Sequence, residues 1–167
     1  MRIGLAKVKI HLFFLMLIVI SLILKFHVNT VTATVAVLPE CGEPVLITPA
    51  GQGPGGAIVN VLCKRNQIEC KEYPRAEAEH LADTKTLIIV LGSSAKGLGQ
   101  AGISIDKELA RVKELADAAK ERNLFILGIH TEGEARRGGH CERVIDEITP
   151  LLDYLLVRSD GNKDGRF

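Results

Sequence analysis

The sequence predicts a single α/β domain built on a mostly parallel five-stranded sheet, and three observations lead to this class. Short apolar runs alternate along the chain with stretches of helical periodicity. Each run is continuously apolar, which is typical of parallel strands buried on both faces. Strands that alternate with helices join through right-handed crossovers, so helices cover both faces of the sheet. We therefore expect a doubly wound sheet of flavodoxin-like order 2-1-3-4-5, with a Rossmann-like order as the alternative.

The first half of the domain predicts two strands and the helix between them. Residues 44–48 form a short apolar run that ends at Pro49. A glycine-rich turn at 51–56 leads into a helix over residues 57–64, whose apolar side chains share one face. A second strand is expected at residues 68–73.

The second half continues the alternation. Residues 86–91 are the clearest buried strand, because they are rich in β-branched residues and carry no charge. After a long turn over residues 92–102, Ser104 is placed to cap a helix that runs to about Arg122 with apolar residues at 4-3-4-3 spacing. The remaining elements are a strand at 124–129, a helix that stops near Pro150 and a strand at 154–157.

Residues 1–36 match a targeting segment and not a part of the domain. Basic residues come first, followed by the apolar run from Leu12 to Leu24 and then by small residues around Ala33 and Ala36. This order predicts a secretory signal peptide, and the alternative is an N-terminal membrane anchor. We expect a linker at residues 37–43, the single domain at 44–167, and an extracytoplasmic protein that is secreted or tethered to the outer face of the cytoplasmic membrane.

Charge and composition exclude some classes of partner. Four of the 21 basic residues precede residue 34, so 17 basic side chains remain against 20 acidic ones in the domain. A mildly acidic domain has no general attraction to nucleic acid or to anionic lipid. Aromatic residues make up 4% of the chain and tryptophan is absent, so base-stacking platforms are not expected. We predict no nucleic-acid partner, and contact with a membrane only through the N-terminal segment.

All four cysteines follow the targeting segment. Cys41, Cys63, Cys70 and Cys141 allow three disulfide pairings, and an oxidising compartment permits them. Cys63 and Cys70 are expected on a helix and the next strand, close enough to pair; free thiols are the alternative. No Cys/His spacing typical of zinc is present, so we predict no metal–thiolate site.

A ligand site is expected at the carboxyl edge of the sheet, where the winding direction reverses between strands one and three. The two glycine-richest turns of the chain follow these strands. Glycine allows close approach of the backbone to a ligand, and helix starts offer free N–H groups to an anion. The alternative is that the glycines only form tight turns. The candidate residues in these turns are Gly51, Gln52, Ser93, Ser94, Lys96 and Gly97.

The most polar cluster of the domain follows the strand at 124–129, again at a carboxyl edge. Arginine side chains suit a carboxylate or phosphate held by two hydrogen bonds, and His130 stands where a general base could act. The alternative is a solvated loop with ordinary Glu–Arg pairs. The candidates in this cluster and at the end of the last strand are His130, Glu134, Arg136, Arg137, Asn162 and Lys163.

The C-terminal residues match the beginning of a calcium loop. Asp160, Asn162 and Asp164 have its spacing, but the chain ends before the glutamate that completes such a loop. These residues are a weak calcium candidate, and no other metal or cofactor is expected.

Three motifs resemble a known family. They are Gly92–Ser104 with the following Ile-Asp-Lys-Glu-Leu, the run Gly133–Gly138, and the terminal segment Gly161–Gly165. Together they resemble a family of small exported bacterial proteins catalogued only as a domain of unknown function, over roughly residues 43–167. The resemblance implies no reaction, substrate or catalytic residue, and the cysteines are not part of its pattern.

The leading functional hypothesis is a non-enzymatic domain that binds or senses a small anionic solute, with Lys96, Arg136 and Arg137 holding the anion. One alternative is a hydrolase in which His130 is the base and Ser93 or Glu132 assists. Another is a protein-interaction module whose partner meets the polar edge.

Overall fold

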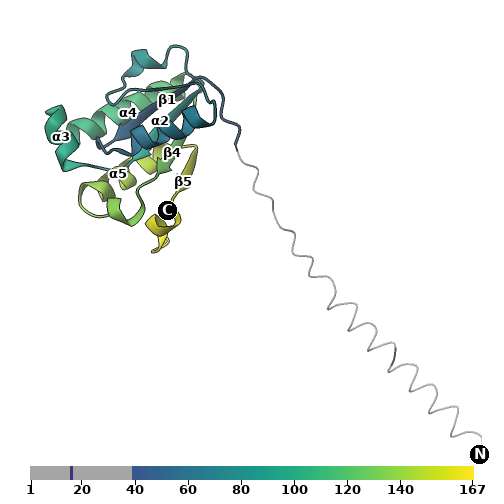
Figure 1. The fold of residues 1–167 in the computed structure, drawn as a ribbon, viewed down its shortest axis with the longest axis vertical. Helices are drawn as coiled ribbons and strands as arrows, with labels where there is room; N and C mark the ends of the chain where they lie inside the picture. The colour runs from purple at the N-terminus through teal and green to yellow at the C-terminus, as the bar shows by residue number, and fades with distance from the viewer. Residues whose placement is uncertain (1–15, 17–38) are drawn as a thin grey trace, which may run out of the picture. The chain divides into compact units, whose positions relative to one another are not determined.

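The computed structural model describes Met16 and residues 39–167, and within this part the chain forms an α/β domain (Figure 1). The elements that form the sheet and its covering layers are β1 (Val45–Ala50), α2 (Gly55–Arg65), β2 (Cys70–Glu72), β3 (Thr86–Leu91), α3 (Ala95–Ala101), α4 (Ile105–Glu121), β4 (Phe125–His130), α5 (His140–Ile148) and β5 (Tyr154–Val157). Short 3-10 helices connect them: η1 (Ala78–Leu81), η2 (Gly133–Arg136), η3 (Thr149–Leu151) and η4 (Ser159–Asn162).

The five strands form one sheet in the order β2-β1-β3-β4-β5, and every neighbouring pair is parallel. The predicted flavodoxin-like order is therefore confirmed, and the Rossmann-like alternative does not apply. The longest register pairs β1 with β3 from Val45–Thr86 to Ala50–Leu91. Because both central strands are fully buried, their sequences are apolar at every position but two threonines and a proline.

The side chains of the strands alternate between two apolar layers. One layer packs the even-numbered side of β1 and the odd-numbered side of β3 against α3, α4 and α5. The other layer, which includes Val45, Ile47, Ile88 and Val90, packs against Val59 and Cys63 of α2. Within the described residues the chain continues after β5 only as the short η4, so α2 alone covers this second face. Large apolar side chains remain half exposed there: Ile58, Val61, Leu62 and Leu156.

Two predicted element boundaries need correction. Pro49 does not end the first strand, because β1 continues through it to Ala50. The N–H of Val45 points toward β2, and by alternation the nitrogen of Pro49 points the same way. Since β2 ends at Glu72 opposite Ile47, the proline removes no ladder hydrogen bond there.

The second correction concerns the long turn predicted at residues 92–102, most of which is the short helix α3. Ser94 caps its start by accepting a hydrogen bond from the Gly97 N–H, and Gly102 ends it in the left-handed conformation. The helix of Ser104 is confirmed as α4, with the Ser104 hydroxyl accepting from the Lys107 N–H.

The predicted signal or anchor segment lies outside the described residues apart from Met16. Within the part that the structure describes, no helix has the length and apolar character needed to cross a bilayer.

Candidate functional site

The two glycine-rich turns meet at the carboxyl edge, as the sequence predicted, but they pair with each other. Gln52 and Ser93 form an isolated antiparallel bridge, and the Ser94 N–H donates to the Gly51 carbonyl at 2.8 Å. Gly97 lies so close that a Cβ there would be 2.1 Å from the Gln52 carbonyl oxygen. The crevice where the strand order reverses is therefore occupied by the protein's own backbone. Lys96 is exposed on α3.

The conformation of Gln52 depends on a buried ion pair beneath it. Gln52 has a positive φ of 56°, which is unfavourable for a residue with a side chain. Its amide donates to the Pro74 carbonyl at 2.8 Å and to Glu108 Oε1 at 2.9 Å. Glu108 is fully buried and also accepts from the Gly51 N–H at 3.1 Å. A carboxylate of α4 thus fixes the turn after β1.

Arg111 completes this arrangement from the next turn of α4. Its five N–H donors are all engaged: two bond Glu108, and the others bond Thr48 Oγ1, the Pro49 carbonyl and the Ala76 carbonyl. The pair therefore joins α4, the end of β1 and the segment after β2. Such complete pairing is what a buried arginine requires, so Arg111 is a structural residue with no donor left for a ligand.

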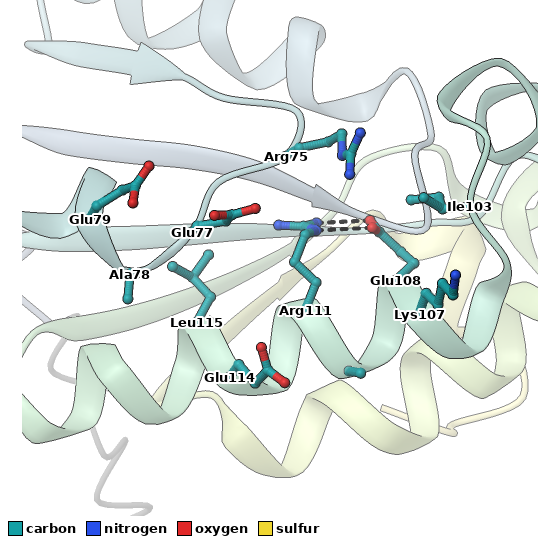
Figure 2. A pocket seen from close by; sticks show the side chains of 11 residues that line it. Arg75, Glu77, Ala78, Glu79, Ile103, Lys107, Glu108, Arg111, Glu114 and Leu115 are labelled. Carbon is teal, nitrogen blue, oxygen red and sulfur yellow. Dashed lines mark hydrogen bonds and ion pairs between the residues drawn. The ribbon is translucent and has the colours of Figure 1, made fainter.

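A cavity of about 500 Å³ lies directly against this ion pair, between segment 75–79 and the first half of α4. Segment 75–79 follows β2 and Arg111 bonds the end of β1, so the cavity belongs to the carboxyl side of these two strands. Figure 2 shows the paired Glu108 and Arg111 side chains in the middle of the lining. Ile103, Ala78 and Leu115 contribute apolar wall. Its volume is within the range of small-molecule sites.

The charges around the cavity are separated by sign. Arg75 and Lys107 lie toward Ile103 in Figure 2, whereas Glu77 and Glu79 lie on the opposite side. Glu114 lines the cavity from α4. Within residues 39–167, neither Arg75 nor Lys107 forms a side-chain hydrogen bond or an ion pair, so both cations remain available to a solute.

The two arginines that the sequence predicted as ligand-binding residues differ in how many of their guanidinium donors already form hydrogen bonds. Arg137 uses all five donors, on Glu142, on Asp164 and on the Gly161 carbonyl. The hydrogen bonds to Asp164 and Glu142 raise its pKa. Arg137 therefore holds the C-terminal residues in place.

Arg136 is less completely engaged. It donates from Nε to Glu132 at 2.7 Å and from Nη1 to the Ser93 carbonyl at 3.2 Å. These bonds leave donors of its guanidinium without a partner in the described residues. Arg136 thus connects the polar cluster after β4 with the glycine-rich turn after β3. Beside it, the Ser93 hydroxyl is buried without a hydrogen-bond partner among the residues described, and the Cys141 thiol lies 3.2 Å from the Ser93 nitrogen.

His130 is fully buried, with Nδ1 at 3.0 Å from the Leu91 carbonyl oxygen and Nε2 at 3.0 Å from that of Gly133. The Phe167 ring packs against it with the ring centroids 5.4 Å apart. Both ring nitrogens are therefore turned to backbone carbonyl groups. This environment is that of a core histidine.

The other predicted residues at this edge form internal pairs. Lys163 bonds Glu134 at 2.7 Å, and both side chains are about two-thirds exposed. Of the calcium candidates, Asp160 pairs with Arg158, Asp164 pairs with Arg137, and the Asn162 Oδ1 accepts from the Phe167 N–H. Among the described residues, no group of three or more His, Cys, Asp or Glu side chains is arranged to hold a metal ion.

The sequence interpretation missed the cavity and the residues that form it. Glu108 and Arg111 left a signal, since they are charged residues at i and i+3 beside the apolar stripe of a helix. A carboxylate placed next to buried leucine and valine positions indicates a buried pair. The sequence gives no signal for Arg75 and Lys107 as site residues, because only the folded chain brings segment 75–79 beside α4.

The family comparison agrees with the resemblance seen in the three motifs. The model of the family described as domain of unknown function DUF6305 matches residues 42–167, and the chain belongs to this family. No curated protein and no solved structure matches the chain significantly.

Proposed function

We propose that the protein is a non-enzymatic binding or sensing domain for a small solute with an anionic group, and that it acts outside the cytoplasmic membrane. The single observation that carries the proposal is the cavity beside α4, whose lining includes Arg75 and Lys107, two cations without a side-chain partner among the described residues. Arg75 and Lys107 would hold the anionic group of the solute. The cations of the predicted edge cluster support the proposal less well, because Arg137 is fully engaged.

The acidic side chains of the lining narrow the class of solute that the cavity would bind. Glu77, Glu79 and Glu114 outnumber Arg75 and Lys107 in the lining, so a multiply charged anion would be repelled. A solute with an anionic group at one end and an amino group at the other would meet a complementary charge on each side. The proposed ligand is therefore a small zwitterion of the amino-acid type. The Glu108–Arg111 pair would contribute rigidity, since a wall that is already ordered loses little entropy on binding.

Isothermal titration calorimetry with a panel of amino acids, small dicarboxylates and inorganic phosphate tests the proposal. The zwitterions are expected to bind, and Arg75→Gln or Lys107→Gln should weaken binding roughly tenfold or more, because each removes a charge-assisted hydrogen bond. Lys120→Gln is the matched control, since Lys120 lies on α4 but does not line the cavity. Equal affinity in all three variants would contradict the assignment.

A further variant separates the cavity from the edge that the sequence predicted. Arg136→Gln removes the guanidinium that keeps free donors beside Ser93. If this variant alone abolishes binding, the solute binds at the edge cluster and not beside α4. Binding that depends on Arg75 and Lys107 supports the cavity.

The two other hypotheses stay predictions without a geometric argument in their favour. A hydrolase based on His130 would need a ring nitrogen open to the substrate, and both face backbone carbonyl groups.

A further inference from the structure

Two cysteines, one on α2 and one on β2, belong to the same apolar layer between this helix and the sheet. Cys63 is in the last turn of α2, and Cys70 is the first residue of β2. Both side chains belong to the apolar layer on this face of the sheet, and the Cys70 sulfur lies 3.9 Å from the carbonyl oxygen of Asn60, three residues before Cys63 on the same helix. The Cys70 sulfur also lies 3.4 Å from the Asn60 Oδ1 atom. Both thiols are free in the structure.

We propose that Cys63 and Cys70 are a redox-active pair that forms a reversible intramolecular disulfide. The oxidant is a disulfide of the glutathione or thiol–disulfide oxidoreductase class. The Cys70 thiolate attacks one sulfur of this disulfide and displaces the other as a thiol. Cys63 then loses its proton and attacks the Cys70 sulfur, and the second thiol leaves. Two protons and two electrons pass in total from the protein to the oxidant.

The surroundings decide the order of these steps. Cys70 is half-buried, whereas Cys63 is 7% exposed. Burial raises the pKa of the Cys63 thiol to about 11, with smaller contributions from Cys70 and Glu43. At neutral pH Cys63 therefore stays protonated and is a poor first nucleophile. Cys70 is the accessible attacking thiol, and Cys63 resolves the mixed disulfide from within the apolar layer.

The other two cysteines are placed differently. Cys141 is buried on α5, the helix whose Val144 and Ile148 pack against the opposite face of the sheet, and its sulfur contacts the Ser93 backbone. Cys41 is exposed but lines the same apolar groove of about 350 Å³ as Cys63, so it is the competitor for this thiol. The bond between Cys63 and Cys70 would fasten α2 to an edge strand of three residues that pairs only with β1.

Peptide mapping of the full chain tests the pairing. The chain is equilibrated with mixtures of reduced and oxidised glutathione, free thiols are trapped, and the protein is digested with trypsin. Lys64 and Arg65 lie between the two cysteines, so trypsin separates them and only a disulfide keeps the two peptides together. We expect the joined pair, with an intact mass about 2 Da lower because two hydrogen atoms are lost. Dithiothreitol should reverse both results and lower the thermal unfolding midpoint by roughly 5–10 °C.

Single variants identify the partners. The joined peptides should persist in Cys41→Ser and Cys141→Ser and disappear in Cys63→Ser and Cys70→Ser. A bond between Cys41 and Cys63 would overturn the proposal. A lasting glutathione adduct on Cys70, or two alkylated thiols under oxidising mixtures, would also overturn it. The three contradicting outcomes are measured in the unmutated chain, so the test does not depend on the folding of a variant. It is also independent of solute binding.

Discussion

Glu108 shows how one buried residue can organise a turn that carries no regular structure of its own. Burial by itself acts to raise the pKa of this carboxyl group. The hydrogen bonds and charge of Arg111, the Gly51 N–H and the Gln52 amide outweigh burial, and the pKa of Glu108 is lowered. The group is therefore ionised at neutral pH and accepts hydrogen bonds from two consecutive residues of the turn. A neutral side chain could not satisfy the same set of donors.

We predict that Glu108→Gln destabilises the domain by about 3–5 kcal/mol, because it leaves the Arg111 guanidinium buried without its counter-charge. Urea unfolding followed by circular dichroism measures the change in the free energy of unfolding. Asp117→Asn is the control, since Asp117 is exposed on the same helix. Its effect should stay within about 0.5 kcal/mol. Similar losses in both variants would mean that the buried pair contributes nothing particular to stability.

At the scale of the elements, the decisive contact is the one between α3 and the turn after β1. The backbone bridge between Gln52 and Ser93 brings the start of α3 against the Gln52 carbonyl, and only a residue without a side chain fits at Gly97. Gly99 lies two positions further along the same helix, and a Cβ at Gly99 would have no neighbour within 4 Å. The two glycines thus have different roles within a single short helix.

This contrast gives a matched pair of substitutions. Gly97→Ala should lower the free energy of unfolding by about 1–3 kcal/mol, because backbone must move to make room for the methyl group. Gly99→Ala should raise it by about 0.5–1 kcal/mol, since alanine is the better helix former. Urea unfolding measures both changes. A stabilising Gly97→Ala would show that the turn after β1 can move away from α3 without cost.

How far the sequence predicts these elements depends on whether the signal is local. Four of the strands were predictable because each is an apolar run bounded by turns, whereas β2 consists of Cys-Lys-Glu and was indicated mainly by its place in the alternation of strands and helices. Helix α3 was not predicted, since two of its seven residues are glycine and its composition is that of a turn. Only the two ends of α3 left a signal in the sequence: Ser94 caps its start, and Gly102 ends it.

The candidate site was predictable only in part, for the same reason. Sequence reasoning placed the glycine turns and the arginine cluster at one edge correctly, because parallel strands all end there. Sequence reasoning could not show that the two glycine-rich turns pair with each other. Nor could it show that all donors of Arg137 form hydrogen bonds with neighbours such as Asp164. Those facts depend on side-chain geometry between segments far apart in the chain.

At the scale of the whole domain, ion pairs join segments that the sheet leaves unconnected. Arg111 joins α4 to the end of β1, and Lys113 joins α4 to Glu147 of α5. Arg137, which directly follows η2, pairs with Glu142 of α5 and with Asp164 near the C-terminus. The carboxylates in these pairs share one property, which is that the charged form is favoured in the folded state. The pKa is lowered for Glu108, Glu142, Glu147 and Asp164, and also for Asp160, which pairs with Arg158 two residues away.

This shared property predicts how stability depends on pH. A carboxyl group whose pKa is lower in the folded than in the unfolded state contributes stability above the unfolded pKa, and the contribution is lost as pH falls through the folded pKa. The free energy of unfolding should therefore be nearly constant from pH 8 to about pH 5 and should fall progressively below about pH 4.5. Urea unfolding at a series of pH values measures it. In Glu108→Gln, whose buried titrating group is missing, the fall should be shallower than in the unmutated chain.

High salt distinguishes the contribution that the buried Glu108–Arg111 pair makes to stability at low pH from the contributions of the exposed ion pairs. Asp164 and Asp146 are more than half exposed, so about 1 M sodium chloride should screen their pairs with arginine. The Glu108–Arg111 pair is shielded from solvent and should keep its effect. The acid transition in high salt is thus expected to be weaker but still present, and the part that remains should vanish in Glu108→Gln. If high salt alone removes the pH dependence, the buried pair does not control the acid stability of the domain, and the surface pairs around Arg137 do.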